Sequence, residues 1–171
     1  VKKNLVLLGM MGVGKTTLGK IVAKRLGLEF IDIDSSIEKE NSMVIKKIFE
    51  KKGEIFFRKE EEKQTLKYLQ KKNCIIALGG GAFINNILRK EILKKNISIW
   101  LDINIKTLNR RVSFSKKRPL LNAEDYKKKI EEIYADRKPI YKLANYRIAC
   151  NNLSKNDIAE KIIILYEKYK N

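Results

Sequence analysis

The chain of 171 residues contains no histidine, and it has only two cysteines and two prolines. The absence of histidine excludes metal sites and general bases that are built on imidazole. Cys74 and Cys150 each lie in an apolar run typical of a strand, so we expect buried free thiols in a reducing cytoplasm. A hydrophobic share of 44% with so few prolines argues against a disordered chain.

Long apolar runs are absent as well. No stretch approaches the roughly 20 apolar residues of a membrane-spanning helix, and the amino end carries no apolar core of a secretory signal. We therefore expect a cytoplasmic protein that has no membrane partner. A chain of this length is expected to fold as one domain, residues 1–171, with a core of its own.

Acidic residues are scarce, since 20 aspartates and glutamates face 38 lysines and arginines, and the formal net charge is +18. Such an excess can serve nucleic-acid binding, or it can be a solvated lysine-rich surface that favours small anionic substrates. The lysines occur in twos and threes with few aromatic residues between them, at 46–47, 51–52, 71–72, 94–95 and 127–129. This scatter favours the solvated surface, so we expect no nucleic-acid partner.

The clearest motif is the run GMMGVGKT at residues 9–16, which fits the phosphate-binding pattern G-x-x-x-x-G-K-[ST]. Its glycines let backbone N–H groups close around phosphate oxygens, while Lys15 can bridge the β- and γ-phosphates and Thr16 can ligate Mg²⁺. An apolar run at 5–8 precedes the motif, and a helical pattern that ends at Gly27 follows it. The alternative is a plain glycine-rich turn, but these flanks favour binding of a nucleoside triphosphate.

Short apolar runs alternate with helical patterns along the chain. The expected strands are 4–8, 29–32, 74–78, 97–101 and 147–150, and the expected helices are 15–26, 35–52, 54–72, 85–95, 104–112, 123–143 and 155–169. This alternation predicts an α/β fold in which helices cover both faces of a parallel sheet, with the site at the carboxyl ends of the strands. Pro139 lies inside a helical pattern, where we expect a kink or a break.

Two further groups of residues accompany these elements. Asp32 and Asp34 close the second strand, and alternation along an extended strand predicts that both carboxylates face the P-loop; the alternative is a helix cap by Asp34 with Asp32 in a turn. One carboxylate could hold Mg²⁺ through water, and the other could accept a proton. Gly79, Gly80 and Gly81 follow the third strand and allow close approach of a ligand, or they form only a flexible connection.

Three arginines stand out from a chain rich in lysine. Arg58 follows two phenylalanines, Arg118 precedes Pro-Leu-Leu in the polar loop 113–122, and Arg137 lies two residues before Pro139. A planar guanidinium suits bidentate recognition of carboxylate or phosphate, which a lysine cannot reproduce. For each arginine taken singly, a surface salt bridge is the simpler interpretation.

Together these pieces resemble the shikimate kinase family over essentially the full chain. The resemblance rests on six motifs in family order, which are the P-loop 9–16, Asp32-Ile33-Asp34, Gly53-Glu54 with Phe57-Arg58, Gly79-Gly80-Gly81-Ala82, Arg118-Pro119-Leu120-Leu121, and Arg137 with Tyr141. It implies a three-layer P-loop kinase fold with sheet order 2-3-1-4-5, a substrate-binding helical segment at about 33–61 and a lid at about 113–123. It also implies transfer of the ATP γ-phosphate to the 3-hydroxyl of shikimate, a step of aromatic amino-acid biosynthesis.

The resemblance also implies roles for individual residues. The expected catalytic residues are Lys15, Asp34 and Arg118, and the expected holders of Mg²⁺ are Thr16 and Asp32, the latter through water. The expected ATP-binding set is Gly12, Val13, Gly14, Lys15, Thr16, Thr17, Arg110 and Arg118. Arg110 resembles the arginine that stacks on adenine, but the adjacent Arg111 leaves this assignment open. Further adenine contacts are expected near residues 152–154. The expected shikimate-binding set is Asp34, Arg58, Gly79, Gly80, Gly81 and Arg137, with Ile45, Phe49, Phe57, Pro119 and Leu120 walling the ring. The expected partners are ATP and shikimate, and the expected state is a monomer.

Two rival functions stay open at the level of sequence. A gluconate or nucleoside-monophosphate kinase on the same fold needs groups for a sugar-acid chain or a nucleobase, whereas Asp34, Arg58 and Arg137 with the glycine triplet favour a compact hydroxylated carboxylate. A P-loop ATPase that grips nucleic acid needs a clustered basic face, which the scattered lysines do not provide.

Overall fold

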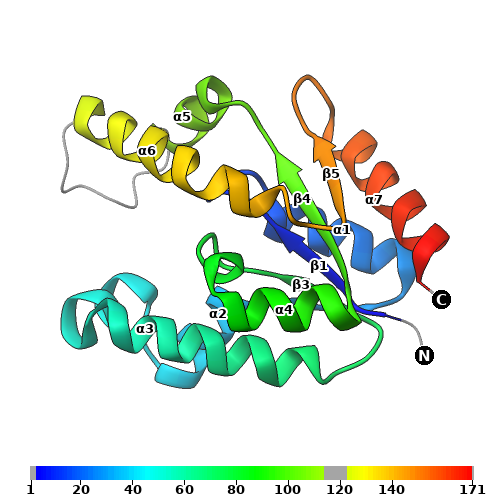
Figure 1. The fold of residues 1–171 in the computed structure, drawn as a ribbon, viewed down its shortest axis with the longest axis horizontal. Coiled ribbons are helices and arrows are strands. Elements are labelled where there is room, and N and C mark those ends of the chain that lie inside the picture. The colour runs from blue at the N-terminus through cyan, green and yellow to red at the C-terminus, as the bar shows by residue number, and fades with distance from the viewer. Residues whose placement is uncertain (1–2, 114–122, 171) are drawn as a thin grey trace.

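The structure is a computed structural model that describes residues 3–113 and 123–170. Its centre is a five-stranded parallel sheet in the order β2-β3-β1-β4-β5 (Figure 1). The strands are β1 (Leu5–Leu8), β2 (Glu29–Asp32), β3 (Cys74–Ala77), β4 (Ile97–Asp102) and β5 (Tyr146–Ala149). In the middle of the sheet, Leu7 of β1 lies opposite Ala77 of β3 on one side and Ile99 of β4 on the other. The sheet order implied by the family resemblance is confirmed.

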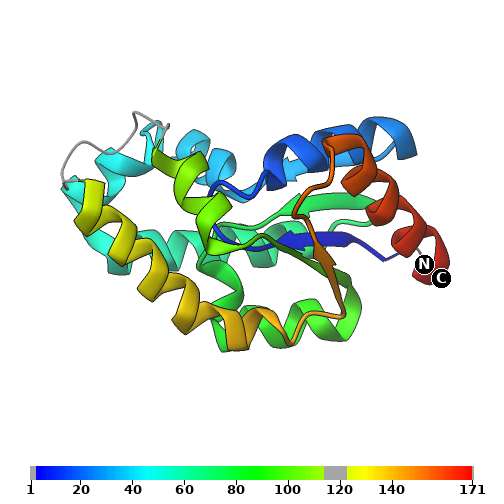
Figure 2. The same ribbon diagram turned by 90° about the horizontal axis from the view of Figure 1, so that it is seen from above.

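Helices cover both faces of this sheet. They are α1 (Lys15–Leu26), α2 (Ile33–Asn41), α3 (Ile45–Leu69), α4 (Asn86–Lys95), α5 (Ile105–Ser113), α6 (Ala123–Tyr141) and α7 (Lys155–Tyr169), with a short 3₁₀ helix η1 (Ala82–Ile84) after β3. Helices α1 and α7 pack side by side on one face, and α4 and α6 lie on the opposite side (Figure 2). The predicted three-layer α/β architecture is therefore confirmed.

The three central strands are apolar because they are buried on both faces. Every residue of β1, β3 and β4 is buried, whereas the edge strands β2 and β5 are partly exposed. Helix α1 presents Leu18 and Val22 to the core, and α7 presents Ile158 and Ile162. Continuous apolar runs such as Leu5–Leu8 are what a parallel strand between two helical layers requires, so these runs predicted the strands correctly.

The helical region after β2 differs from the expectation. We expected a break near Gly53, and Gly53 does depart from helical geometry inside α3, with φ 78° and ψ 171°. A second break, which the periodicity did not predict, separates α2 from α3 at residues 42–44, where Ser42 adopts a left-handed φ of 48°. Serine is not a strong marker of this conformation, and the apolar pattern runs across the break without interruption.

The break expected at Pro139 does not occur, because α6 continues to Tyr141. Proline lacks only its own N–H, and here it lies in the last turn of the helix. The chain beyond it stays hydrogen-bonded, since the Lys142 N–H donates to the Lys138 carbonyl over 3.1 Å. The cost of the proline is therefore confined to the end of α6.

The parallel arrangement brings four loops to one edge of the sheet. The P-loop follows β1, Asp32 ends β2, the glycine triplet 79–81 follows β3, and α5 begins three residues after β4. Carboxyl ends of parallel strands are the usual position of ligand sites in open α/β sheets.

Within the described ranges 3–113 and 123–170, no helix combines the length and the apolar character needed to cross a lipid bilayer.

Candidate active site

The P-loop is held against the sheet by its first glycine. Gly9 has φ +141°, and a Cβ built there would lie 2.6 Å from the backbone oxygen of Leu101 in β4, so no larger residue fits. Gly14 precedes α1 and gives it no side-chain cap. The Lys15 ammonium donates hydrogen bonds to the Gly9 carbonyl over 2.8 Å and to the Met10 carbonyl over 3.0 Å. The loop thus presents a cation beside the positive end of a helix, as phosphate binding requires.

Thr16 and Asp32 meet beside this loop. The Thr16 hydroxyl donates to Oδ2 of Asp32 over 2.5 Å, and the other oxygen of Asp32 accepts the Ser35 N–H over 3.1 Å. Hydroxyl and carboxylate oxygens are ligands that Mg²⁺ accepts. Among the residues that the structure describes there is no group of three or more acidic or sulfur ligands that could hold a metal, so an ion at Thr16 and Asp32 would need further ligands from phosphate or water.

The argument that placed Asp32 and Asp34 on one strand was wrong, although both carboxylates do lie near the P-loop. Asp32 ends β2 and is itself the N-cap of α2, and Asp34 lies in the first turn of that helix. The alternative, a cap made by Asp34, is wrong as well. The chain turns into a helix immediately after β2, so it is the helical turn, rather than strand alternation, that positions Asp34.

Asp34 and Lys15 form an electrostatic pair with displaced pKa values. Burial raises the pKa of Asp34 to about 6, and the nearby Asp32 and Glu61 add to this rise while Lys15 opposes it. Burial likewise lowers the pKa of Lys15 to about 8, against the attraction of Asp34 and Asp32. Oδ1 of Asp34 is buried and accepts no hydrogen bond from any described residue. The site therefore contains a carboxylate with an unused acceptor and a pKa close to neutral.

The glycine triplet is the place where the predicted substrate-binding residues meet. A Cβ on Gly79 would lie 2.8 Å from Oδ1 of Asp34, a Cβ on Gly80 would lie 3.1 Å from Nη1 of Arg137, and a Cβ on Gly81 would lie 2.5 Å from Nη1 of Arg58. Each glycine thus faces a different charged side chain. The N–H groups of Gly80 and Gly81 donate no hydrogen bond to any described residue. Free amides between two guanidinium groups form a cradle suited to an anion.

Glu61 is a component of the site that the sequence did not reveal. Its side chain is 3% exposed, and Oε2 accepts a hydrogen bond from Nη1 of Arg58 over 2.7 Å. Oε1 has no partner among the described residues, and it would lie 2.5 Å from a Cβ on Gly79. Burial raises the pKa of Glu61, while Arg58 opposes the rise. Residues 60–62 are three consecutive glutamates, and both Glu61 and Glu62 stand at helical spacing from Arg58, so the sequence could not single out the middle one.

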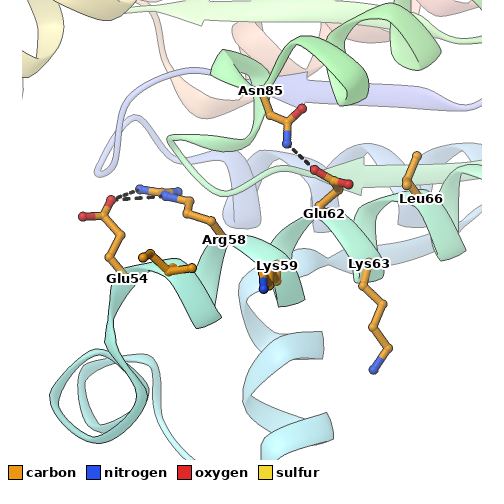
Figure 3. A pocket seen from close by; sticks show the side chains of 8 residues that line it. Glu54, Arg58, Lys59, Glu62, Lys63, Leu66 and Asn85 are labelled. Atoms are coloured by element: carbon orange, nitrogen blue, oxygen red, sulfur yellow. Dashed lines mark hydrogen bonds and ion pairs between the residues drawn. The ribbon is translucent and has the colours of Figure 1, made fainter.

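A second glutamate and a shallow pocket lie on the outer side of Arg58. Glu54 Oε1 accepts from Nη2 of Arg58 over 3.3 Å (Figure 3). With Glu61, this places two acidic side chains against the guanidinium. The pocket has a volume of about 710 Å³ and runs along α3. At its far wall the Asn85 amide donates to Glu62 over 2.6 Å. Asn85 also caps α4, so this contact fastens the segment after the glycine triplet to α3.

Apolar side chains flank the polar groups. The rings of Phe49 and Phe57 lie 4.6 Å apart, and the Arg58 guanidinium lies 5.2 Å from the Phe57 ring. Phe57 is 5% exposed and Phe49 is 37% exposed, so Phe49 forms the accessible side of this pair. Ile45 is partly buried and packs against the core at the start of α3. The structure therefore brings the predicted ring-wall residues of α3 together.

Helix α6 reaches the triplet from the other side of the site. The buried Tyr141 hydroxyl donates to the Gly80 carbonyl over 2.5 Å, one helical turn beyond Arg137. Earlier on the same helix, Tyr134 donates to Oδ1 of Asp102 over 3.0 Å, and Asp102 also pairs with Arg147 of β5. These contacts join α6 to the ends of β3 and β4.

The nucleotide side of the site is described in part. Nη1 of Arg111 donates to the Val13 carbonyl of the P-loop over 3.3 Å. Arg110 is exposed on α5. Arg118, with Pro119, Leu120 and most of the expected lid 113–123, lies outside the described residues.

We expect the Asp34→Asn variant to be more stable than the wild type at about pH 8. The pKa of Asp34 rises from 3.8 to about 6 on folding, so its stabilising contribution is complete below the lower value and is lost as pH rises through the higher one. The variant avoids this loss, worth about 2–3 kcal/mol, and we expect its unfolding midpoint to rise by about 5 °C. Circular dichroism melts at about pH 8 and pH 4 measure this, and the two proteins should converge at the lower pH. Equal or lower stability of the variant at the higher pH would contradict the prediction.

Comparison with known proteins gives a consistent family. The model of the family described as "Shikimate kinase" matches residues 11–167. A shikimate kinase of Caldanaerobacter subterraneus subsp. tengcongensis is 41% identical over 168 residues, with 98% of each chain covered. That of Bacillus subtilis is 40% identical over 164 residues, with 95% of this chain and 88% of the relative covered.

A solved structure agrees with these sequences. The shikimate kinase of Acinetobacter baumannii in complex with shikimate superposes with a TM-score of 0.90 at 35% identity, covering 99% of this chain and 97% of that one. A gluconokinase of Sinorhizobium meliloti has a TM-score of 0.64 at 10% identity, which shows a shared fold alone. The chain therefore belongs to the shikimate kinase family.

Proposed function

We propose that this chain transfers the γ-phosphate of ATP to the 3-hydroxyl of shikimate and yields ADP and shikimate 3-phosphate. The hydroxyl oxygen forms a bond to the γ-phosphorus, the bond from that phosphorus to the β,γ-bridging oxygen breaks, and the hydroxyl proton leaves. The observation that carries the proposal is the meeting of Asp34, Arg58 and Arg137 at the glycine triplet 79–81, beside a P-loop. Membership of the shikimate kinase family and the likeness to a structure that contains shikimate support it.

The P-loop holds the nucleotide in this proposal. The N–H groups of Gly12, Val13 and Gly14 with the first turn of α1, which includes Thr17, surround the phosphates, and Lys15 places its charge on the transferring group. Thr16 and Asp32 would hold Mg²⁺, Asp32 through water, and the ion would supply positive charge to the phosphate groups.

Asp34 accepts the hydroxyl proton. Its free Oδ1 is an acceptor within a buried site, and its pKa of about 6 leaves it mostly ionised at neutral pH while making it a better base than an ordinary aspartate. The chain has no histidine that could take this role. The carboxylate also orients the hydroxyl for attack along the line to the phosphorus.

The carboxylate of shikimate is bound by Arg58, Arg137 and the backbone of the glycine triplet. Two guanidinium groups and free amides supply several charge-assisted hydrogen bonds to a small anion. Glu61 holds Arg58 in place. Ile45, Phe49 and Phe57 close the apolar side of the ring.

The remaining assignments complete the proposal. The helical segment 33–61 serves as the substrate-binding part of one domain, residues 1–171, and the lid 113–123 brings Arg118 onto the phosphates, which excludes water from the reaction. Arg110 provides the arginine at the nucleotide, with the adjacent Arg111, whose guanidinium donates to the Val13 carbonyl of the P-loop, as the alternative. The protein acts as a monomer without nucleic acid, in the cytoplasm.

The proposal is tested by a coupled assay of ADP release. We expect release that depends on both shikimate and Mg²⁺, because both the acceptor site and the phosphate site must be filled. Parallel reactions contain gluconate, nucleoside monophosphates or single-stranded DNA in place of shikimate. Equal turnover with gluconate, or stimulation of ADP release by DNA alone, would refute the assignment of shikimate as the acceptor.

Replacing either carboxylate-binding arginine by lysine should weaken shikimate binding although the charge is kept. A lysine lacks the planar fork, and each lost charge-assisted hydrogen bond costs about 1.5–3 kcal/mol. We expect the KM for shikimate to rise about tenfold or more in Arg58→Lys and in Arg137→Lys. Steady-state kinetics with ATP saturating measure this, and Arg25→Lys on α1, whose guanidinium contacts Asn156 and Glu160 of α7, is a matched control away from the triplet. An unchanged KM in both variants would show that the carboxylate is bound elsewhere.

The Asp34→Asn variant should lose kcat far more than it loses affinity for ATP. Asparagine keeps the size of the side chain, but it cannot accept the proton or carry the charge. Loss of a general base costs about 10²–10⁴-fold, and we expect the lower half of this range because the loose transition state of phosphoryl transfer demands little early deprotonation. Single-turnover kinetics and ATP titration separate the two effects. Near-normal kcat in this variant would refute the role of Asp34.

A further inference from the structure

Tyr141, the last residue of α6, is a buried tyrosine whose hydroxyl reaches the glycine triplet. Its side chain is 1% exposed, and the ring lies 6.0 Å from the ring of Trp100. The hydroxyl donates to the Gly80 carbonyl over 2.5 Å, and the sulfur of Met10 lies 3.9 Å away as a weak second contact. Burial raises the pKa of Tyr141, while the charge and the hydrogen bond of Arg137 oppose the rise, and the hydroxyl keeps its proton and acts as a donor.

The peptide that Tyr141 holds lies between the two arginines of the site. It joins Gly80, which faces Nη1 of Arg137, to Gly81, which faces Nη1 of Arg58. In a trans peptide the carbonyl of one residue and the N–H of the next point in opposite directions. A hydrogen bond that fixes the Gly80 carbonyl therefore also fixes the direction of the Gly81 N–H, which donates to no described residue.

This peptide needs such a restraint because glycine flanks it on both sides. Glycine adopts many backbone conformations that other residues avoid, so a Gly-Gly peptide can rotate at little steric cost. The neighbouring backbone hydrogen bonds, from Ala82 N–H to the Gly79 carbonyl and from Ile84 N–H to the Gly81 carbonyl, leave the Gly80 carbonyl to Tyr141. Removing the hydroxyl leaves a partly buried carbonyl without its donor, which favours rotation of the peptide toward another partner.

We propose that Tyr141 is a positioning residue for the substrate carboxylate, because its hydroxyl holds the Gly80–Gly81 peptide so that the Gly81 N–H joins Arg58 and Arg137 as one set of donors. Tyr141 and Arg137 are four residues apart on α6, so a single helix sets both the guanidinium and the peptide. The inference rests on the proposed function, because it assumes that these two arginines bind the carboxylate of the acceptor. It adds to that function a residue that does not itself touch the substrate.

The test compares Tyr141→Phe with a matched control, Tyr166→Phe. Tyr166 on α7 is 2% exposed, and its hydroxyl also donates to a backbone carbonyl, that of Lys3 over 3.1 Å. Lys3 precedes β1, so this bond lies at the amino-terminal edge of the sheet, opposite the site. Both variants keep the aromatic ring and lose one buried hydrogen bond to the backbone. For each protein we measure the KM for shikimate, the KM for ATP, kcat and the unfolding midpoint.

We expect the KM for shikimate to rise about tenfold in Tyr141→Phe, while the KM for ATP stays within about twofold of the wild type. Tyr166→Phe should change neither KM, although both variants should melt a few degrees earlier than the wild type. An unchanged KM for shikimate in Tyr141→Phe would overturn the proposal, as would an equal rise of both KM values or an equal effect of Tyr166→Phe. The measurement on the wild type separates failure of this inference from failure of the proposed function. A wild-type protein that does not use shikimate refutes the proposed function itself.

Discussion

Charged side chains approach the glycine triplet 79–81 so closely that a Cβ atom at any of the three positions would force one of them to shift. The space that Cβ atoms would occupy is taken by Asp34 and Glu61 at Gly79, by Arg137 at Gly80 and by Arg58 at Gly81. Two of these distances are only 2.5 Å, so even alanine would force a buried charged group to move. The triplet thus allows groups from α2, α3 and α6 to approach one strand end closely.

The second consequence is electrostatic. Burial shifts the pKa values of Asp34 and Lys15 toward one another, to about 6 and about 8, although the attraction between the two groups opposes both shifts. Each shift shows that burial disfavours the charged form of the group, Asp34 or Lys15. Keeping both groups charged therefore makes the folded state less stable than it would be with neutral side chains at these positions. This cost is typical of sites that carry chemistry, because a base near neutral pKa and a desolvated cation act more strongly on a substrate than solvated groups do.

Helix α6 connects this site to the rest of the sheet. Tyr134 contacts Asp102 at the end of β4, and Tyr141 contacts Gly80 after β3, so the helix is held at two points on either side of Arg137. Proline at position 139 does not disturb this arrangement, because it falls in the last turn. The same helix begins at Ala123, directly after the expected lid, and it therefore links that segment to the acceptor site along the chain.

The sequence by itself determined the elements and the chemistry of the loops. Apolar runs defined the strands because central strands are buried on both faces, and the P-loop and the glycine triplet were visible because only glycine permits such backbone approaches. Local pattern also identified Arg58 and Arg137, since they are rare arginines in a lysine-rich chain. The family resemblance then assigned them to one site.

The tertiary structure decided which of several similar residues enters the site and how. It selected Glu61 from three consecutive glutamates, brought Arg111 against the P-loop, and made Asp32, the last residue of β2, the N-cap of α2. It also gave Tyr141 a bond to a peptide 61 residues away in sequence. Such choices depend on which face of a helix meets a distant loop. That orientation is set by packing between elements, and a local sequence pattern contains no information about this packing.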